Sequence, residues 1–161
     1  MTGFDIRLLG KEDAAAAALL HEASFSNGEH WSAFAFRDML ELRTTLGLAA
    51  ERQGKLAGLI LIQRTPPDAE ILTLAVSRAH RRMGLAAQLL RQAAELLGQY
   101  GIDRLLLDVA ADNDGAVAFY RSAGFLADGR RKNYYQREGG SQTDAILMSR
   151  TVAGQIGESG A

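Results

Sequence analysis

The chain contains no cysteine and only three histidines. The absence of cysteine excludes disulfide bonds, thiolate metal sites and a thiol nucleophile. His21, His30 and His80 do not have the spacing of a metal site, and no His-Glu-x-x-His motif exists because position 25 is Phe. We therefore predict that the protein binds no metal.

An excess of charge of either sign is also missing, since the formal net charge is −1 and the isoelectric point is about 6.3. Nucleic acids and anionic membrane surfaces bind proteins with a clear basic excess, so we predict neither as a partner. The first residues have no apolar segment after a basic start, and no later run reaches the length that crosses a bilayer. We expect a cytoplasmic protein.

The size and composition fit one globular domain, because 161 residues with 47% hydrophobic content can bury an ordinary core. We assign residues 1–150 to this domain. Residues 151–161 are small and polar, so we expect them to form a flexible tail. For the oligomeric state, we expect a monomer or a weak dimer.

Residues 70–99 form the central stretch of the chain. An apolar run over residues 71–76 predicts a strand that is central in its sheet and buried on both faces. The basic turn Arg81-Arg82-Met83-Gly84 follows, and apolar residues from Leu85 to Leu97 then repeat at the spacing of an amphipathic helix. The start of a helix exposes unpaired amides that attract anions, so these amides could hold a pyrophosphate. The alternative is a solvated basic helix start.

The other segments predict a mixture of strands and helices. We expect strands at 5–9, 46–52, 56–64, 104–109, 125–135 and 145–150, and helices at 12–23, 32–42 and from 113 to about 123. Ser32 is suited to cap the second helix, with Trp31 stapling its first turn. Hairpins combined with one strand-helix-strand crossover predict an α/β domain with a mixed sheet.

Two residues that follow the central helix in the sequence, Asp108 and Tyr120, are candidates for catalytic roles. Asp108 is the only charge in the apolar strand that ends at Val109, and partial burial would raise its pKa toward that of a useful base. Alternatively, it accepts backbone N–H bonds at the end of the strand. Tyr120 lies in the next helix, and its neutral phenol could donate a proton to a leaving group; the alternative is a packing residue.

Two motifs resemble those of one enzyme family. The order strand, Arg81-x-x-Gly84-x-Ala86, helix resembles the coenzyme A signature of the GNAT N-acetyltransferases, Gln/Arg-x-x-Gly-x-Gly/Ala. Residues 108–125 resemble a second hallmark, Glu-Val-x-x-x-Asn-x-x-Ala-x-x-Leu-Tyr-x-x-x-Gly-Phe. Two further segments, 30–32 and 130–145, resemble more narrowly the bacterial ribosomal-protein-alanine N-acetyltransferases. The likeness extends to about Arg150.

The resemblance implies the GNAT fold, with a mixed, mostly antiparallel sheet of about seven strands flanked by about four helices. It also implies acetyl-CoA as the acetyl donor. The contacts that it implies for this donor come from Leu74, Ala75, Val76, Arg81, Arg82, Met83, Gly84, Leu85, Ala86, Ala87, Asn113 and Tyr120. Tyr120 matches the general acid of the family and Asp108 occupies the position of its glutamate base. Because Asp is one methylene shorter, either a water fills the gap or the base lies elsewhere, with Glu70 as the second candidate.

The resemblance also implies an acceptor, the N-terminal α-amine of a protein, most specifically a ribosomal protein that begins with alanine. Trp31, Tyr134 and Tyr135 are the candidate substrate-binding residues, with Asn133 beside them. The alternatives are a helix staple for Trp31 and ordinary hairpin packing for the other aromatic residues. Two further functions compete with this one: a GNAT enzyme that acts on lysine side chains or small amines, and a non-catalytic module that binds coenzyme A.

Overall fold

The computed structural model describes residues 3–25 and 31–153. Its elements in chain order are β1 (Asp5–Leu8), η1 (Lys11–Asp13), α1 (Ala14–Ser24), α2 (Ala33–Leu40), β2 (Thr45–Arg52), β3 (Lys55–Thr65), β4 (Asp68–Val76), η2 (Arg78–His80), α3 (Leu85–Gln99), β5 (Arg104–Ala110), α4 (Asp114–Ser122), β6 (Leu126–Gln136), η3 (Glu138–Gly140) and β7 (Gln142–Thr151). His30, which belongs to the segment 30–32 of the resemblance, lies outside the described residues.

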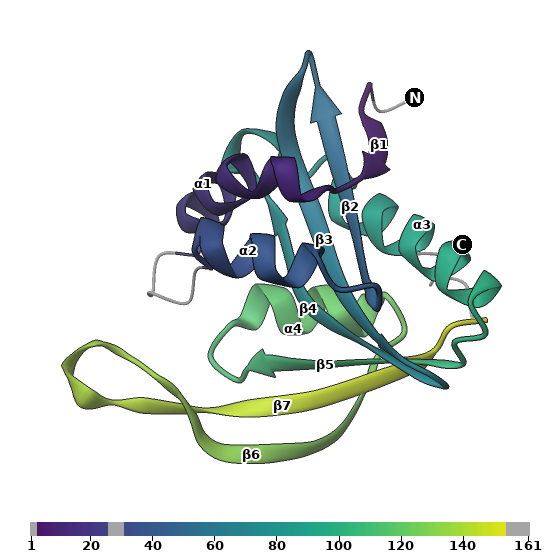
Figure 1. Cartoon of the computed structure of the whole chain (residues 1–161). Helices are drawn as coiled ribbons and strands as arrows, with labels where there is room; N and C mark the ends of the chain where they lie inside the picture. The colour runs from purple at the N-terminus through teal and green to yellow at the C-terminus, as the bar shows by residue number, and fades with distance from the viewer. Residues whose placement is uncertain (1–2, 26–30, 154–161) are drawn as a thin grey trace.

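Seven strands within the described ranges form one sheet in the order β1-β2-β3-β4-β5-β7-β6. All neighbouring strands pair antiparallel except β4 and β5, which are parallel. Four α-helices accompany this sheet in the same residues. The prediction of a mixed, mostly antiparallel sheet with about seven strands and about four helices is therefore confirmed, and β4 is the central strand (Figure 1).

The helices cover the sheet in two layers (Figure 1). Buried side chains of α1 and α2 pack with Leu59, Leu61 and Ala75 on one face of the sheet. Buried side chains of α3 and α4 pack with alternate residues of the same strands on the other face. At Gly58, an added Cβ would lie 3.2 Å from a Leu85 methyl, so this glycine lets the start of α3 approach the sheet closely.

The central strand differs from its prediction in one respect. Its pairing with β5 covers only residues 68–70, and a bulge opposite Leu61 and Ile62 changes the face that its side chains occupy. Beyond the bulge, Leu72, Leu74 and Val76 are half-buried rather than buried. The expectation of a strand buried on both faces is therefore wrong for this half, where β4 and β5 separate.

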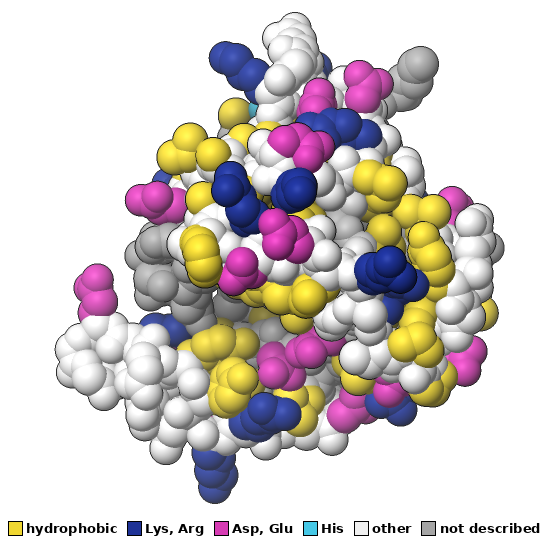
Figure 2. Space-filling view, in the orientation of Figure 1, with side chains coloured by type: hydrophobic (Ala, Val, Ile, Leu, Met, Phe, Trp, Pro, Cys, Tyr) yellow, Lys and Arg dark blue, Asp and Glu magenta, His cyan; other side chains and the backbone are white. Residues whose placement is uncertain are grey.

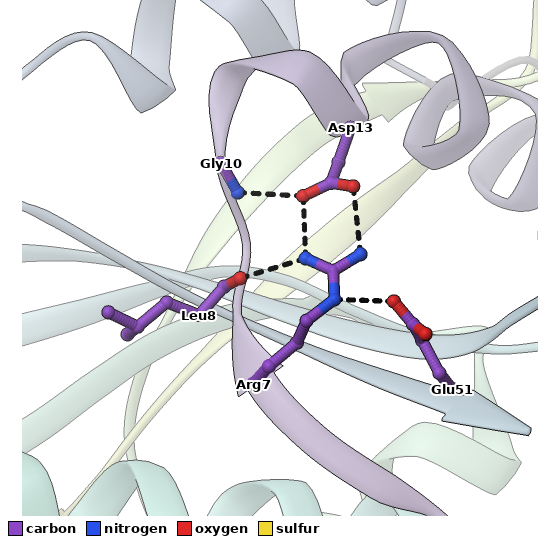
Figure 3. A network of polar contacts seen from close by, with 5 residues as sticks. All are labelled: Arg7, Leu8, Gly10, Asp13 and Glu51. Carbon is purple, nitrogen blue, oxygen red and sulfur yellow. Dashed lines mark hydrogen bonds and ion pairs between the residues drawn. The ribbon is translucent and has the colours of Figure 1, made fainter. Parts of the chain in front are cut away.

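A polar network fixes the first strand against its neighbours (Figure 3). The Arg7 guanidinium donates two hydrogen bonds to the Asp13 carboxylate, at 2.8 and 2.9 Å, and a third to Glu51 on β2. Asp13 also accepts the Gly10 N–H at 2.8 Å. These donors hold the pKa of the Asp13 carboxyl below its usual range, with the Arg7 hydrogen bonds as the main cause.

Element boundaries follow the sequence patterns with local differences. The predicted helix at 12–23 begins as the 3₁₀ turn η1 and continues as α1. The last strand, β7, runs to Thr151, and buried Val152 donates its N–H to the Asp103 carbonyl at 2.8 Å. Figure 2 shows acidic and basic side chains interspersed over one face. Within residues 3–25 and 31–153, no helix has the length and apolar character needed to cross a membrane.

Candidate functional site

The separation of β4 from β5 leaves one edge of β4 open. Ser77 donates its N–H to the Ala57 carbonyl on β3 at 2.8 Å. Because backbone groups alternate along a strand, the N–H and C=O groups of Leu74 and Val76 point to the opposite edge, toward the gap. The backbone of Ala75 instead belongs to the ladder with β3, although the residue also lines the gap.

The facing edge of β5 has the same character. Ala111 donates its N–H to the Asp144 carbonyl at 2.8 Å, so the alternation directs the backbone of Asp108 and Ala110 toward the gap. The Ala110 carbonyl accepts the Asn113 N–H at 3.0 Å, and the Asn113 side chain caps α4 by accepting the Ala116 N–H at 3.2 Å. The gap is therefore bounded by polar backbone groups on both sides.

A groove of about 940 Å³ occupies this gap. Leu74, Ala75 and Val76 line it from β4, Arg81, Arg82 and Ala86 from the turn and the start of α3, and Asn113, Phe119 and Tyr120 from the far side. The amides at the start of α3 have no side-chain cap, since the N-cap residue is Gly84 with φ of +75°. This rim joins two guanidinium groups with the positive end of a 15-residue helix, which suits a diphosphate.

Four of the predicted cofactor residues do not line this groove. Met83 and Gly84 line a separate hollow of about 620 Å³, together with Gln88 and Arg91. The Leu85 side chain is buried in the core under α3. Ala87 is half-buried on the same helix. The side chains of Arg81, Arg82 and Ala86 are thus the part of this turn that faces the groove.

A second pocket of about 200 Å³ continues from the groove. The two share Phe25, Leu74, Asn113, Ala116 and Tyr120 as lining residues. The pocket is further lined by Asp108, Trp31 and Tyr135, which come from three distant parts of the sequence. The structure therefore brings Asp108 and Tyr120 to one cavity, and Tyr120 lies where this cavity meets the groove.

Tyr120 is buried where the two cavities meet. Its ring packs edge-to-face against Phe119 and Phe125, with centroid distances of 5.2 and 5.4 Å. Burial raises the pKa of the Tyr120 phenol above its ordinary value, so the group keeps its proton at neutral pH. None of the described residues hydrogen-bonds this hydroxyl, which leaves its proton available to a ligand.

Asp108 shares one face of the sheet with Glu70. Leu105, Leu107 and Val109 pack toward α3 and α4, so Leu106 and Asp108 point to the α1 and α2 side. Glu70 pairs with Leu106 across the parallel strands and lies on that same side. Partial burial and the negative charge of Asp108 raise the pKa of Glu70, while Arg131 opposes the shift. Both carboxylates therefore remain candidates for the base.

The three predicted aromatic residues have different positions. Trp31 lines the pocket and also packs on Phe36 at 5.4 Å, four positions into α2, so the staple is present as well. Tyr135 lines the pocket, and its ring contacts Tyr134 edge-to-face at 5.1 Å. Tyr134 itself is 48% exposed, with the Arg131 guanidinium 5.3 Å from its ring. Next to them, Asn133 adopts a left-handed backbone with φ of +54° and donates its N–H to Asp144.

The sequence patterns did not single out a polar contact at the back of the pocket. His21 of α1 is 1% exposed, its Nε2 lies 2.7 Å from Thr73 Oγ1, and its Nδ1 accepts the Trp31 N–H at 3.0 Å. Both His21 and Thr73 line the pocket. The sequence did contain one signal for this contact, because His21 is a polar residue on the buried face of an alanine-rich helix.

A second such contact crosses the mouth of the groove. Arg137, at the end of β6, donates from Nε and Nη2 to both oxygens of Asp112 at 2.9 and 2.8 Å. Its guanidinium also lies 5.7 Å from the Tyr135 ring. Arg137 and Asp112 both line the groove. This bidentate pair ties the β6–β7 hairpin to the loop before α4.

Comparisons with known proteins agree with this architecture. Residues 16–125 match the Acetyltransferase (GNAT) family. N-alpha-acetyltransferase RimI of Mycobacterium tuberculosis is 34% identical over 149 residues, which cover 90% of each chain. The [Ribosomal protein bS18]-alanine N-acetyltransferase of Escherichia coli is 32% identical over 67% of this chain and 72% of its own.

The fold comparison gives the same result. The crystal structure of the ribosomal-protein-S18-alanine N-acetyltransferase from Escherichia coli superposes with a TM-score of 0.85 at 28% identity, covering 96% of this chain and 97% of that one. The seven-stranded sheet with its separated β4 and β5 is thus the GNAT fold. On the family match, the relatives and the fold together, the protein belongs to the GNAT family of acetyltransferases.

Proposed function

We propose that the protein transfers an acetyl group from acetyl-CoA to the N-terminal α-amine of a protein, most specifically a ribosomal protein that begins with alanine. The observation that carries the proposal is the junction of the groove and the pocket at Leu74 and Tyr120, with Asp108 in the same pocket. The alanine acceptor is supported by the similarity to the Escherichia coli relative, a [Ribosomal protein bS18]-alanine N-acetyltransferase, and to the crystal structure of the ribosomal-protein-S18-alanine N-acetyltransferase from Escherichia coli.

The groove fits the chemistry of coenzyme A. Arg81 and Arg82 are exposed cations beside the start of α3, where a diphosphate finds opposite charge and free amides. The open edge of β4 offers the N–H and C=O groups of Leu74 and the N–H of Val76 to the amide groups of a pantetheine arm, which can add to the strand as another strand would. The Val76 carbonyl already accepts from Ser24 Oγ and Arg81 Nε, each at 3.4 Å. When bound, the donor supplies an acetyl thioester.

The chain's residues then have defined roles in a direct transfer. Asp108 accepts a proton from the amine, through a water where its shorter side chain does not reach. A backbone N–H at the open edge of β4 stabilises the negative charge that develops on the acetyl oxygen. As the new C–N bond forms and the C–S bond breaks, Tyr120 donates its proton to the sulfur. Solvent restores the protonation states of both side chains.

An α-amine suits this pocket better than a lysine side chain. The pKa of a terminal α-amine is about 8, whereas that of lysine is about 10.4, so the former is far more often neutral at pH 7. A volume of about 200 Å³ matches a small first residue. Positioning the neutral amine against the thioester supplies the remaining rate.

The test is a panel of matched peptides incubated with acetyl-CoA. One peptide begins Ala-Arg with a free amine, a second is the same peptide with a blocked N-terminus and an internal lysine, and a third begins with a bulky residue. We expect thiol release and a mass gain at the N-terminus for the first peptide only. Thiol release with the lysine peptide alone would refute the proposal in favour of a side-chain acetyltransferase. Binding of acetyl-CoA with no thiol release from any peptide would indicate a non-catalytic module.

A further inference from the structure

The contact between His21 and Thr73 fixes the direction of a hydrogen bond. The Trp31 N–H donates to His21 Nδ1, so this nitrogen carries a lone pair and no proton. A neutral imidazole with a bare Nδ1 carries its proton on Nε2. His21 Nε2 therefore donates to Thr73 Oγ1 across the 2.7 Å contact, and Thr73 is the acceptor.

This direction leaves the proton of the Thr73 hydroxyl without a protein acceptor. No described residue other than His21 hydrogen-bonds Thr73 Oγ1, and the residue is only 8% exposed. A hydroxyl that already accepts one bond still has a proton to donate and one more lone pair. Because a buried donor without a partner is costly, this proton must find its acceptor in the pocket that Thr73 lines.

Thr73 lies on the face of the sheet that carries the reacting groups. Its bond to α1 places it on the α1 and α2 side, which is also the side of Asp108. The bulge at Leu72 produces this placement, since Ala69 and Ile71 before it pack toward α3. The donor therefore lies in the cavity that holds Asp108 and Tyr120, across the gap from β5.

We propose that the Thr73 hydroxyl, oriented by His21, donates a hydrogen bond to the carbonyl oxygen of the first residue of the acceptor peptide. The inference rests on the proposed function and adds a basis for its selectivity. An N-terminal α-amine has a carbonyl two bonds away, on the carbon attached to Cα, whereas a lysine ε-amine or a simple alkylamine has none. Thr73 thus selects α-amines of peptides, and His21 is a positioning residue.

The test compares two acceptors on three proteins. One acceptor is an alanine-first peptide, and the other has its first peptide bond replaced by an E-alkene, which keeps the shape but removes the carbonyl oxygen. We expect Thr73→Val to lower kcat/KM for the amide peptide about tenfold, mostly through KM for the acceptor, and to change the alkene peptide by less than about twofold. Thr73→Ser should restore most of the preference for the amide.

Two controls separate this role from a structural one. Thr45→Val on β2 makes the same substitution at a half-buried strand threonine away from the pocket, and should change neither acceptor. In ¹⁵N-labelled protein, the His21 ring should show a protonated Nε2 and a bare Nδ1 at neutral pH. A bare Nε2 would overturn the inference directly.

The outcomes also separate this inference from the proposed function. Equal losses of Thr73→Val on both acceptors, or no loss on either, would refute the role of Thr73 while the unsubstituted protein still acetylates alanine-first peptides. If the unsubstituted protein acetylates only lysine side chains, the proposed function fails, and this inference fails with it.

Discussion

Replacing Tyr120 with Phe removes one hydroxyl from the junction of the groove and the pocket. The Phe ring keeps the edge-to-face contacts with Phe119 and Phe125, at 5.2 and 5.4 Å. No described residue hydrogen-bonds the lost hydroxyl, so its removal leaves no protein donor or acceptor unpaired. We expect the free energy of unfolding to change by less than about 0.5 kcal/mol.

The effect on acetyl transfer should be much larger than the effect on stability. General acids contribute about 10²- to 10⁴-fold to rate. A thiol with a pKa near 8.5 leaves fairly well as the thiolate, which places the expected loss at the lower end of this range, about 10²-fold in kcat. The same argument predicts that the deficit of Tyr120→Phe shrinks above about pH 8.5, where the thiolate needs no proton.

The assay follows thiol release with acetyl-CoA and the alanine-first peptide, and calorimetry gives the affinity for acetyl-CoA. Tyr100→Phe is the matched control, because Tyr100 is 52% exposed at the end of α3 and its ring packs under Arg64. We expect this control to behave as the unsubstituted protein. Equal kcat for Tyr120→Phe and the unsubstituted protein, or a loss of affinity as large as the loss of rate, would remove Tyr120 as the acid.

Three further predictions test other parts of the structure. Arg82→Gln should weaken binding of acetyl-CoA about tenfold and leave acetyl-pantetheine, which lacks the diphosphate, unchanged in calorimetry. Asp108→Asn should lower kcat/KM about 10²-fold. The acidic limb of the pH profile of any residual activity should move to lower pH, because the negative charge of Asp108 contributes to the raised pKa of Glu70. A near-normal rate would make Glu70 the base. Asp13→Asn should destabilise the fold by about 1 kcal/mol at pH 7 in urea denaturation. Because the pKa of Asp13 is lowered in the folded state, this stabilisation is present above about pH 4 and is lost as the pH falls through the folded pKa, so the difference should vanish in acid.

The arrangement of elements was predictable because each one has a local signal. Ser32 caps α2 by accepting the Ala35 N–H at 3.0 Å, as its position before an apolar segment predicts. Gln53 and Gly54, both with positive φ, form the turn between β2 and β3 that their sequence favours. Helix α3 begins at the first residue of its apolar repeat and ends two residues after the last one. These features depend on neighbours in the chain, which a single sequence displays.

The roles of individual β4 residues depend on pairing that no local pattern displays. An apolar run predicts burial, but it does not show that β5 leaves β4 after Glu70. The resemblance therefore implied cofactor contacts from Leu74, Ala75 and Val76 alike, whereas the hydrogen bond from Ser77 to Ala57 directs only the backbone groups of Leu74 and Val76 to the open edge. For the same reason, the apolar run gave no sign that Thr73 lines a pocket.

The bulge opposite Leu61 and Ile62 adds one residue, Leu72, to β4, and this extra residue determines which face the following side chains occupy. Without it, the period of two would give Ala69, Ile71, Thr73 and Ala75 one common face. Thr73 would then lie under α3 with no histidine to bond, and Leu74 would lie on the side of α1. The extra residue lets the first half of β4 anchor α3 while the second half directs Thr73 toward His21 and Asp108. The pocket thus depends on one irregularity in backbone pairing.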